Sequence, residues 1–258
     1  MISRLSAITF NTFREAVRDR VLYNLIIFAL LLVATAPLFS QISLGIEKLI
    51  LVNAGLSAIS IFGIIIAIFI GIGLVSKEIE KKTLYTILSR PVRRWEFIAG
   101  KYFGLLMTLV VNAFFMTAGF YLALLIVSRG LAMDDARLLI AIYFIILEFF
   151  IVTAVTLLFS SFSTPIFAAI FAFALFAIGT FSEDLHNFAS LAHGVTKWLA
   201  TGAAYLVPNF ATLNVISQVA HSESISAKLV LFNTVYALLY SLTAVVIAIV
   251  IFERRNLK

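Results

Sequence analysis

The stretch SKEIEKKTLYTILSRPVRRWEFIAGK, residues 76–101, separates two long apolar runs and carries seven of the chain's 19 lysine and arginine residues. The chain is 62% hydrophobic and 12% charged, with 25 phenylalanines in 258 residues. A soluble domain of this size leaves roughly a quarter of its unfolded surface in water, and this sequence has too little polar surface for that. The composition therefore predicts a membrane protein.

Six apolar windows are long enough to cross the hydrocarbon core, which takes about 20 helical residues. Lipid cannot satisfy exposed backbone amides, so each is expected to be a helix and the fold class is all-α. A seventh window, 203–219, contains Pro208 and Asn209, and we interpret it as a re-entrant or interfacial helix. The six predicted spans are 21–39, 54–75, 102–127, 138–159, 165–181 and 229–252.

The distribution of positive charge predicts the orientation of these spans. With six spans, both termini and the 76–101 stretch lie on one side, which holds 14 of the 19 lysines and arginines. The positive-inside rule places that side in the cytoplasm. Orientation then accounts for the net charge of +6, and no nucleic-acid partner is expected.

Residues 1–258 are predicted to form one transmembrane domain with three accessory segments, of which 1–20 is the first. In helical projection its apolar and charged side chains separate, which predicts an amphipathic helix at the membrane interface. A simple charged anchor is the alternative. The apolar face holds Ile2, Leu5, Phe10, Phe13 and Val17, the polar face Arg4, Asn11, Arg14, Glu15 and Arg18, and Ile8 lies off this pattern.

The second accessory segment is residues 76–94, on the cytoplasmic side. A helix from Ser76 to about Ser89 would place Leu84, Ile87 and Leu88 in one apolar strip, and Pro91 would end it. A stiff, two-sided helix between two spans can pass force from a soluble partner into the membrane. The alternative is a charged loop that only sets the orientation.

This same stretch resembles the cytoplasmic signature of permease subunits of type-two ATP-binding-cassette (ABC) exporters. The signature has an acidic pair, Thr-Leu, Leu, Pro-Val-x-Arg, Glu and Gly-Lys. Where the family often has glycine before the threonine, this chain has Lys82. The matching residues are Glu78, Glu80, Thr83, Leu84, Leu88, Pro91, Val92, Arg94, Glu96, Gly100 and Lys101.

The resemblance implies a six-span permease in a prokaryotic cytoplasmic (inner) membrane, paired with a second copy or a close paralogue. It also implies a separate nucleotide-binding ATPase subunit that holds ATP and magnesium. Consistent with this, the chain has no phosphate-binding Walker A loop, because Trp95 and Tyr102 stand where Gly and Ser or Thr are required around Gly100-Lys101. No cofactor on this chain is expected. The implied ATPase-contacting residues are Glu78, Glu80, Thr83, Leu84, Ile87, Leu88, Pro91 and Arg94.

Two polar residues stand out within the predicted spans. Glu148 lies near the middle of the fourth, where an acidic residue costs about 2.5–3.5 kcal/mol on insertion scales. Asn112 is expected at a similar depth in the third. We predict that Glu148 either pairs with Asn112 or lines the substrate route.

Small residues mark close helix packing. Gly63, Ala67 and Gly71 recur every four residues in the second span, and Ala168 and Ala172 do so in the fifth. The family's permease contact uses the first and fifth spans. Ala168 and Ala172 are therefore expected either at the dimer seam or in packing within one subunit.

The third accessory segment, 182–228, is a 47-residue connection on the external side, where the family places short helices that cap the pathway. Glu183, His186 and His193 would share a face of one helix, but their spacing is too loose to predict a metal site, and we interpret them as a solvated polar face.

Two other protein classes remain as alternatives. An intramembrane enzyme should show several ionisable or nucleophilic groups at membrane depth, and only Glu148 is there. A self-contained secondary transporter should show an internal repeat, and none is evident.

Overall fold

The computed structural model describes residues 2–18, 47–80, 93–128, 130, 133–191 and 193–254, together with 23, 26, 27, 30, 31, 34 and 35. Most of the predicted first span and residues 81–92 lie outside the described residues. The described elements are α1 (Ile2–Arg18), α3 (Glu47–Glu80), α5 (Arg94–Ser128), η1 (Met133–Arg137), α6 (Leu138–Phe162), α7 (Pro165–Thr180), α8 (Ser182–Leu191), α9 (Gly194–Leu206), η2 (Ala211–Leu213), α10 (Ile216–Ala220) and α11 (Ala227–Arg254).

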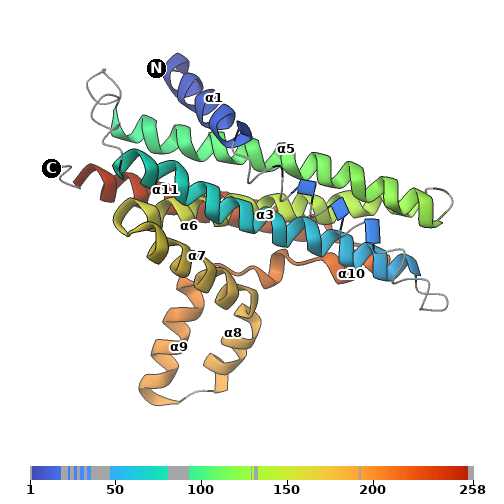
Figure 1. Ribbon diagram of the computed structural model, residues 1–258. Coiled ribbons are helices and arrows are strands. Elements are labelled where there is room, and N and C mark those ends of the chain that lie inside the picture. The colour runs from blue at the N-terminus through green and yellow to red at the C-terminus, as the bar shows by residue number, and fades with distance from the viewer. Residues whose placement is uncertain are drawn as a thin grey trace.

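The described part of the chain is all-α and is organised around four long helices, α3, α5, α6 and α11, that run side by side (Figure 1). Each is long and apolar enough to cross a membrane. The count rises to six if the bent pairs α7 with α8 and α9 with 211–220 are each taken as one span. The all-α membrane class is thus confirmed, with four to six candidate spans among the described residues.

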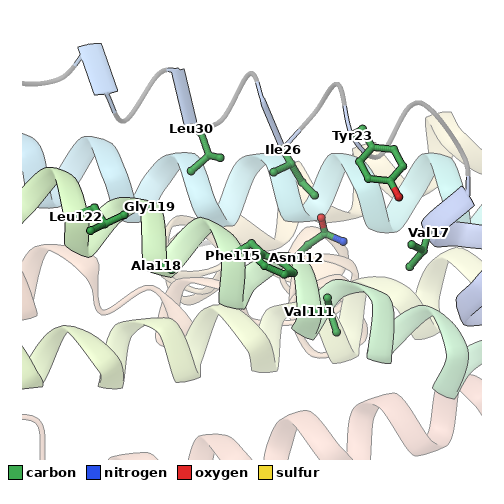
Figure 2. A pocket seen from close by; sticks show the side chains of 10 residues that line it. All are labelled: Val17, Tyr23, Ile26, Leu30, Val111, Asn112, Phe115, Ala118, Gly119 and Leu122. Atoms are coloured by element: carbon green, nitrogen blue, oxygen red, sulfur yellow. The ribbon is translucent and has the colours of Figure 1, made fainter.

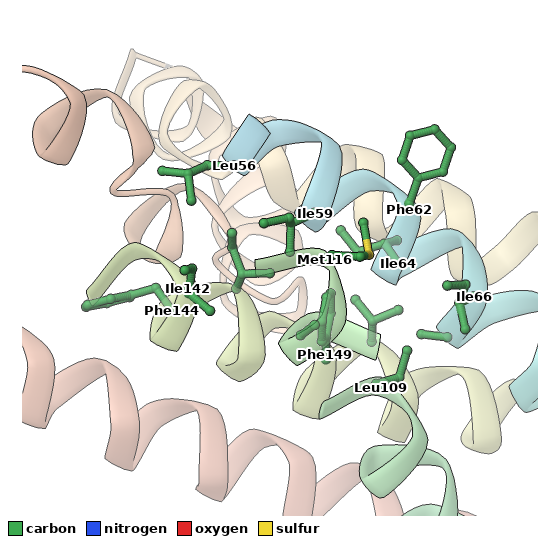
Figure 3. Packing of buried hydrophobic residues seen from close by; sticks show 14 of the residues in the cluster. Leu56, Ile59, Phe62, Ile64, Ile66, Leu109, Met116, Ile142, Phe144 and Phe149 are labelled. Carbon is green, nitrogen blue, oxygen red and sulfur yellow. The ribbon is translucent and has the colours of Figure 1, made fainter. Parts of the chain in front are cut away.

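Helix α6 lies at the centre of this bundle and packs against α3, α5, α7 and α11. Because it is apolar on every side, it can be buried on every side. Its Phe149 ring fills the space beside Gly63 of α3, where an added Cβ would overlap the ring. Figure 3 shows part of the main cluster, with Leu56, Ile59, Phe62, Ile64 and Ile66 of α3, Leu109 and Met116 of α5, and Ile142, Phe144 and Phe149 of α6.

The small residues of the second span therefore serve packing within the chain. A Cβ at Gly71 would lie 2.9 Å from Leu105 of α5 and 3.0 Å from Thr156 of α6, and Ala67 is fully buried. Glycine lets the three helix backbones approach closely here.

Both chain termini lie at the same end of the bundle, beside the end of α3 and the start of α5 (Figure 1). At this end the Arg94 guanidinium donates hydrogen bonds to the carbonyls of Phe252, at 3.1 Å, and Glu253, at 2.8 Å. These carbonyls lie in the last described turn of α11, where a cation complements the helix dipole. Arg94 thus ties the start of α5 to the end of α11.

Candidate functional site

Helix α1 lies across the first half of α5, and two glycines of α5 make the contact possible (Figure 1). A Cβ on Gly100 would lie 2.5 Å from Cγ2 of Ile8, and one on Gly104 would lie 2.5 Å from Cβ of Thr12. Glycines four residues apart form a smooth strip on which another helix can rest. The off-pattern Ile8 is therefore a contact residue of this interface.

A buried lysine lies between these two glycines. Lys101 is 1% exposed, and its Nζ lies 3.2 Å from Oε2 of Glu15 on α1 and 5.6 Å from the centre of the Phe97 ring. A charge so far from water needs an opposite charge or hydrogen-bond acceptors close by. The sequence pattern placed Glu15 on the polar side of the amphipathic helix. In the structure its side chain, still 43% exposed, reaches Lys101 at the helix interface.

The apolar side of α1 is also only partly covered by the protein. Thr12 and Ala16 are buried, whereas Phe10 is 54% exposed. The face against α5 therefore consists largely of small side chains. Phe10 therefore stays on the side of α1 that faces away from the bundle.

At the start of α5, a side chain of the first turn accepts a hydrogen bond from the backbone N–H just before the helix. The backbone N–H of Arg93 donates to Oε2 of Glu96 at 2.9 Å, and Glu96 is buried. This is the arrangement by which an acidic residue in the first turn satisfies a free N–H just before the helix. Arg94 and Glu96 of the sequence signature thus both have structural roles at the point where the chain enters α5.

The rest of the predicted coupling segment is described only in part. Residues 76–80 continue α3 without a break, so no separate helix begins at Ser76. Glu78 and Glu80 lie on this extension, and their side chains are outside the described residues. Thr83, Leu84, Ile87, Leu88 and Pro91 also lie outside the described residues.

Glu148, the acidic residue of the spans, contacts a serine. The hydroxyl of Ser60 on α3 donates to Oε2 of Glu148 at 2.8 Å, and Glu148 is buried in α6. Asn112 instead donates through Nδ2 to the Thr108 carbonyl at 2.8 Å. The structure thus gives Glu148 a different hydrogen-bond partner from the one expected.

Sequence reasoning missed Ser60, although a signal was present. Ser60 precedes Gly63 by three residues, so the two share one face of α3. Gly63 packs on Phe149, the neighbour of Glu148. The small-residue strip of α3 therefore marked the helix that faces Glu148.

Ala168 and Ala172 of α7 lie inside the single chain. They are 0% and 2% exposed and belong to the main core cluster, since α7 packs against α3 and α6. A side chain buried in its own subunit has no surface left for a second copy. The opposite face of α7 is uncovered, and it carries Ile166, Phe167, Ile170, Phe171 and Ile178.

The 182–228 connection is interrupted where the sequence predicted a re-entrant or interfacial helix. Helix α9 ends at Leu206, and the pair formed by α9 and 211–220 is bent by 42°. At the break, the backbone N–H of Asn209 donates to the Tyr236 hydroxyl at 2.8 Å, and its side-chain oxygen accepts from Ser182 at 2.6 Å. The Tyr240 hydroxyl donates to the Leu206 carbonyl at 3.0 Å. Two tyrosines of α11 thus hold the break in place.

Helices α8 and α9 project from the bundle as a pair (Figure 1) and expose large apolar side chains, with Trp198 at 82%. The three residues predicted to share a helical face do not, because α8 ends at Leu191 and His193 precedes α9 in an extended conformation. Glu183 is exposed near the start of α8. Within the residues described, no group of three His, Asp or Glu side chains is placed to hold a metal ion.

A bundle of long apolar helices, with an amphipathic helix locked against one of them and a broken helix at the far end, defines a multi-span α-helical membrane protein. Residues 6–257 match the family described as ABC-2 family transporter protein, and the chain belongs to this family. None of the curated proteins matches the chain.

Proposed function

We propose that the chain is the permease subunit of an ABC exporter. It acts as a homodimer, or with a close paralogue, in the cytoplasmic membrane of a prokaryote, with both termini in the cytoplasm. A separate nucleotide-binding subunit holds ATP and magnesium, and its hydrolysis cycle drives translocation. The match over residues 6–257 supports the transporter class, and export and coupling are our extension of it.

The observation that carries this proposal is the convergence of contacts at the start of α5. The coupling segment, residues 76–94, ends at Arg94. The guanidinium of this residue donates hydrogen bonds to the last described turn of α11. Within the next three turns, Gly100, Lys101 and Gly104 contact α1. A displacement of the coupling segment is therefore passed to three helices at once, because packed helices move as rigid elements.

We place the second copy of the proposed homodimer on the uncovered face of α7. Phe167 and Phe171 stack on each other there, with ring centres 6.3 Å apart, beside Ile166 and Ile170. Ala168 and Ala172 support this face from beneath by letting α7 lie close to α3 and α6. Together with the exposed side of α9, this face offers the apolar surface that a membrane-embedded dimer needs.

The test is whether the chain copurifies with its nucleotide-binding ATPase subunit. A tagged chain, co-expressed with the candidate nucleotide-binding subunit of its own organism, should retain a soluble ATPase, and reconstitution should change its hydrolysis rate. Leu84→Asp or Leu88→Asp should abolish capture while the permease still inserts, because each puts a charge on the apolar strip. Lys82→Asp, on the other side of the predicted helix, should retain it. Transport by the purified chain alone would refute the proposal.

A further inference from the structure

A pocket of about 630 Å³ lies between α5 and the described residues of the predicted first span. In Figure 2, Tyr23, Ile26 and Leu30 face α5 across it. Apart from Asn112 and the Tyr23 hydroxyl, the lining side chains are apolar. The lining is completed by Val17, Val111, Phe115, Ala118, Gly119 and Leu122.

Asn112 gives this pocket one hydrogen-bonding group. The side chain is 2% exposed, its Nδ2 donates to the Thr108 carbonyl, and its Oδ1 is buried with no hydrogen-bond partner. In Figure 2 this oxygen points from α5 toward the side of the pocket formed by Ile26 and Tyr23. A buried amide oxygen without a donor is unfavourable, and such groups in proteins usually have a partner.

We propose that this pocket binds a single-chain amphiphile, a long-chain alcohol or amide, whose O–H or N–H donates to Oδ1 of Asn112. The volume falls within the roughly 300–1,000 Å³ of small-molecule sites. Two turns of a helix would fill on the order of 1,000 Å³, so the pocket is too small for a partner helix. The apolar lining matches a hydrocarbon chain, and the amide oxygen matches one donor.

The depth of Asn112 selects among amphiphiles. It lies 18 residues after the start of α5, near the middle of that 35-residue helix. Phospholipid head groups stay at the surface of a hydrocarbon core about 30 Å thick, so their donors do not reach this depth. A single-chain alcohol or amide can lie deeper. The site requires neither a direction of transport nor a motor, and it is therefore independent of the proposed function.

The inference can be tested with the full chain in nanodiscs of phosphatidylcholine, whose head group has no hydrogen-bond donor. The probes are a diazirine-bearing hexadecanol and its methyl ether, which has the same chain but cannot donate. The alcohol should label the pocket roughly 3- to 10-fold more than the ether, the range expected for one net hydrogen bond. Peptide mapping should place the label within residues 111–122.

Three variants separate the two features of the site. Ala118→Phe fills the pocket and should lower labelling by both probes at least several-fold. Asn112→Leu removes the acceptor and should make alcohol and ether label equally. Val246→Phe adds the same ring to an exposed position of α11, away from the pocket, and should label as wild type does. Size-exclusion chromatography checks folding, and Leu122→Trp replaces Ala118→Phe if that variant fails to fold.

Four results would overturn the inference. Equal labelling of the wild type by alcohol and ether would remove the role of Asn112. Unchanged labelling of a folded cavity-filling variant would place the probe elsewhere. Displacement of the alcohol by added phosphatidylglycerol would assign the pocket to a phospholipid. A change of oligomeric state in Ala118→Phe without any wild-type labelling would assign it to a second copy.

Discussion

Lys101 of α5 and Glu15 of α1 form an ion pair with 3.2 Å between Nζ and Oε2, in which the lysine is buried and the glutamate is half-exposed. The two residues lie 86 positions apart in the chain. The pair joins an amphipathic surface helix to a membrane-spanning helix directly after the predicted coupling segment.

Glu15→Gln should lower the free energy of unfolding by about 1–2 kcal/mol, because it leaves the buried Lys101 charge without its carboxylate. The effect stays below that of a fully buried pair since water screens the exposed side of Glu15. Denaturant titration and thermal unfolding in detergent measure this loss.

The matched control is Arg14→Gln, on the exposed side of α1, which should cost little. Adding Lys101→Met to Glu15→Gln should restore much of the loss, and equal effects of Glu15→Gln and Arg14→Gln would contradict the buried pair.

Gly104→Ala should destabilise the chain by about 1–3 kcal/mol through overpacking. The new methyl group would lie 2.5 Å from Cβ of Thr12 and 2.8 Å from the Thr9 carbonyl oxygen, so α1 must move away. Faster hydrogen exchange in residues 2–18 should accompany the loss.

The matched control for the glycine contact is Gly202→Ala in α9, where nothing lies within 4 Å of the added Cβ. Helix propensity alone favours alanine over glycine by about 1 kcal/mol, so this change should be neutral or stabilising. If Gly104→Ala behaved in the same way, the close approach of α1 to α5 would be disproved.

Ser60→Ala should cost about 1–2 kcal/mol, because it removes the hydroxyl that donates to the buried Glu148 carboxyl group. Ser57→Ala, one turn earlier on α3, is the control. The penalty of Ser60→Ala should largely disappear in a Glu148→Leu background, as a double-mutant cycle would show. Equal penalties in both backgrounds would mean that the two side chains do not interact.

A further variant at this position separates the two roles left open for Glu148. If Glu148→Gln lowers thermal stability while transport per folded molecule is unchanged, the carboxyl group serves packing of α6 against α3. A loss of transport without a loss of stability would place it on the substrate route.

Arg94→Ala should release the last turn of α11, because it deletes the donor to the carbonyls of Phe252 and Glu253. Amide exchange at residues 250–254 should accelerate about fivefold, which corresponds to roughly 1 kcal/mol for partly exposed hydrogen bonds. Arg93→Ala is the control, since Arg93 contacts Glu96 through its backbone N–H. Equal exchange rates in the two variants would contradict the role of Arg94.

Some parts of the candidate site were predictable and others were not. The resemblance pointed to Arg94, Glu96, Gly100 and Lys101, yet nothing in the sequence paired Lys101 with Glu15. Asn112 and Glu148 were singled out for their polarity at membrane depth, but their hydrogen-bond partners were not foreseen. Polarity shows that a buried group needs a partner, whereas the identity of that partner depends on which helix faces it.

The sequence by itself determined the class of the protein and most of its helices, because a bilayer admits only long apolar helices and these are visible as hydropathy. Tertiary structure alone decided which sides of those helices meet. The sequence of a helix that is apolar all round, as α6 is, does not show which of its sides faces which neighbour. The contact of Phe149 with Gly63 and the burial of Ala168 therefore depend on how the neighbouring helices fit together. Side chains at an interface must fit each other in shape, and that fit depends on both helices, so the sequence of one helix alone cannot predict it.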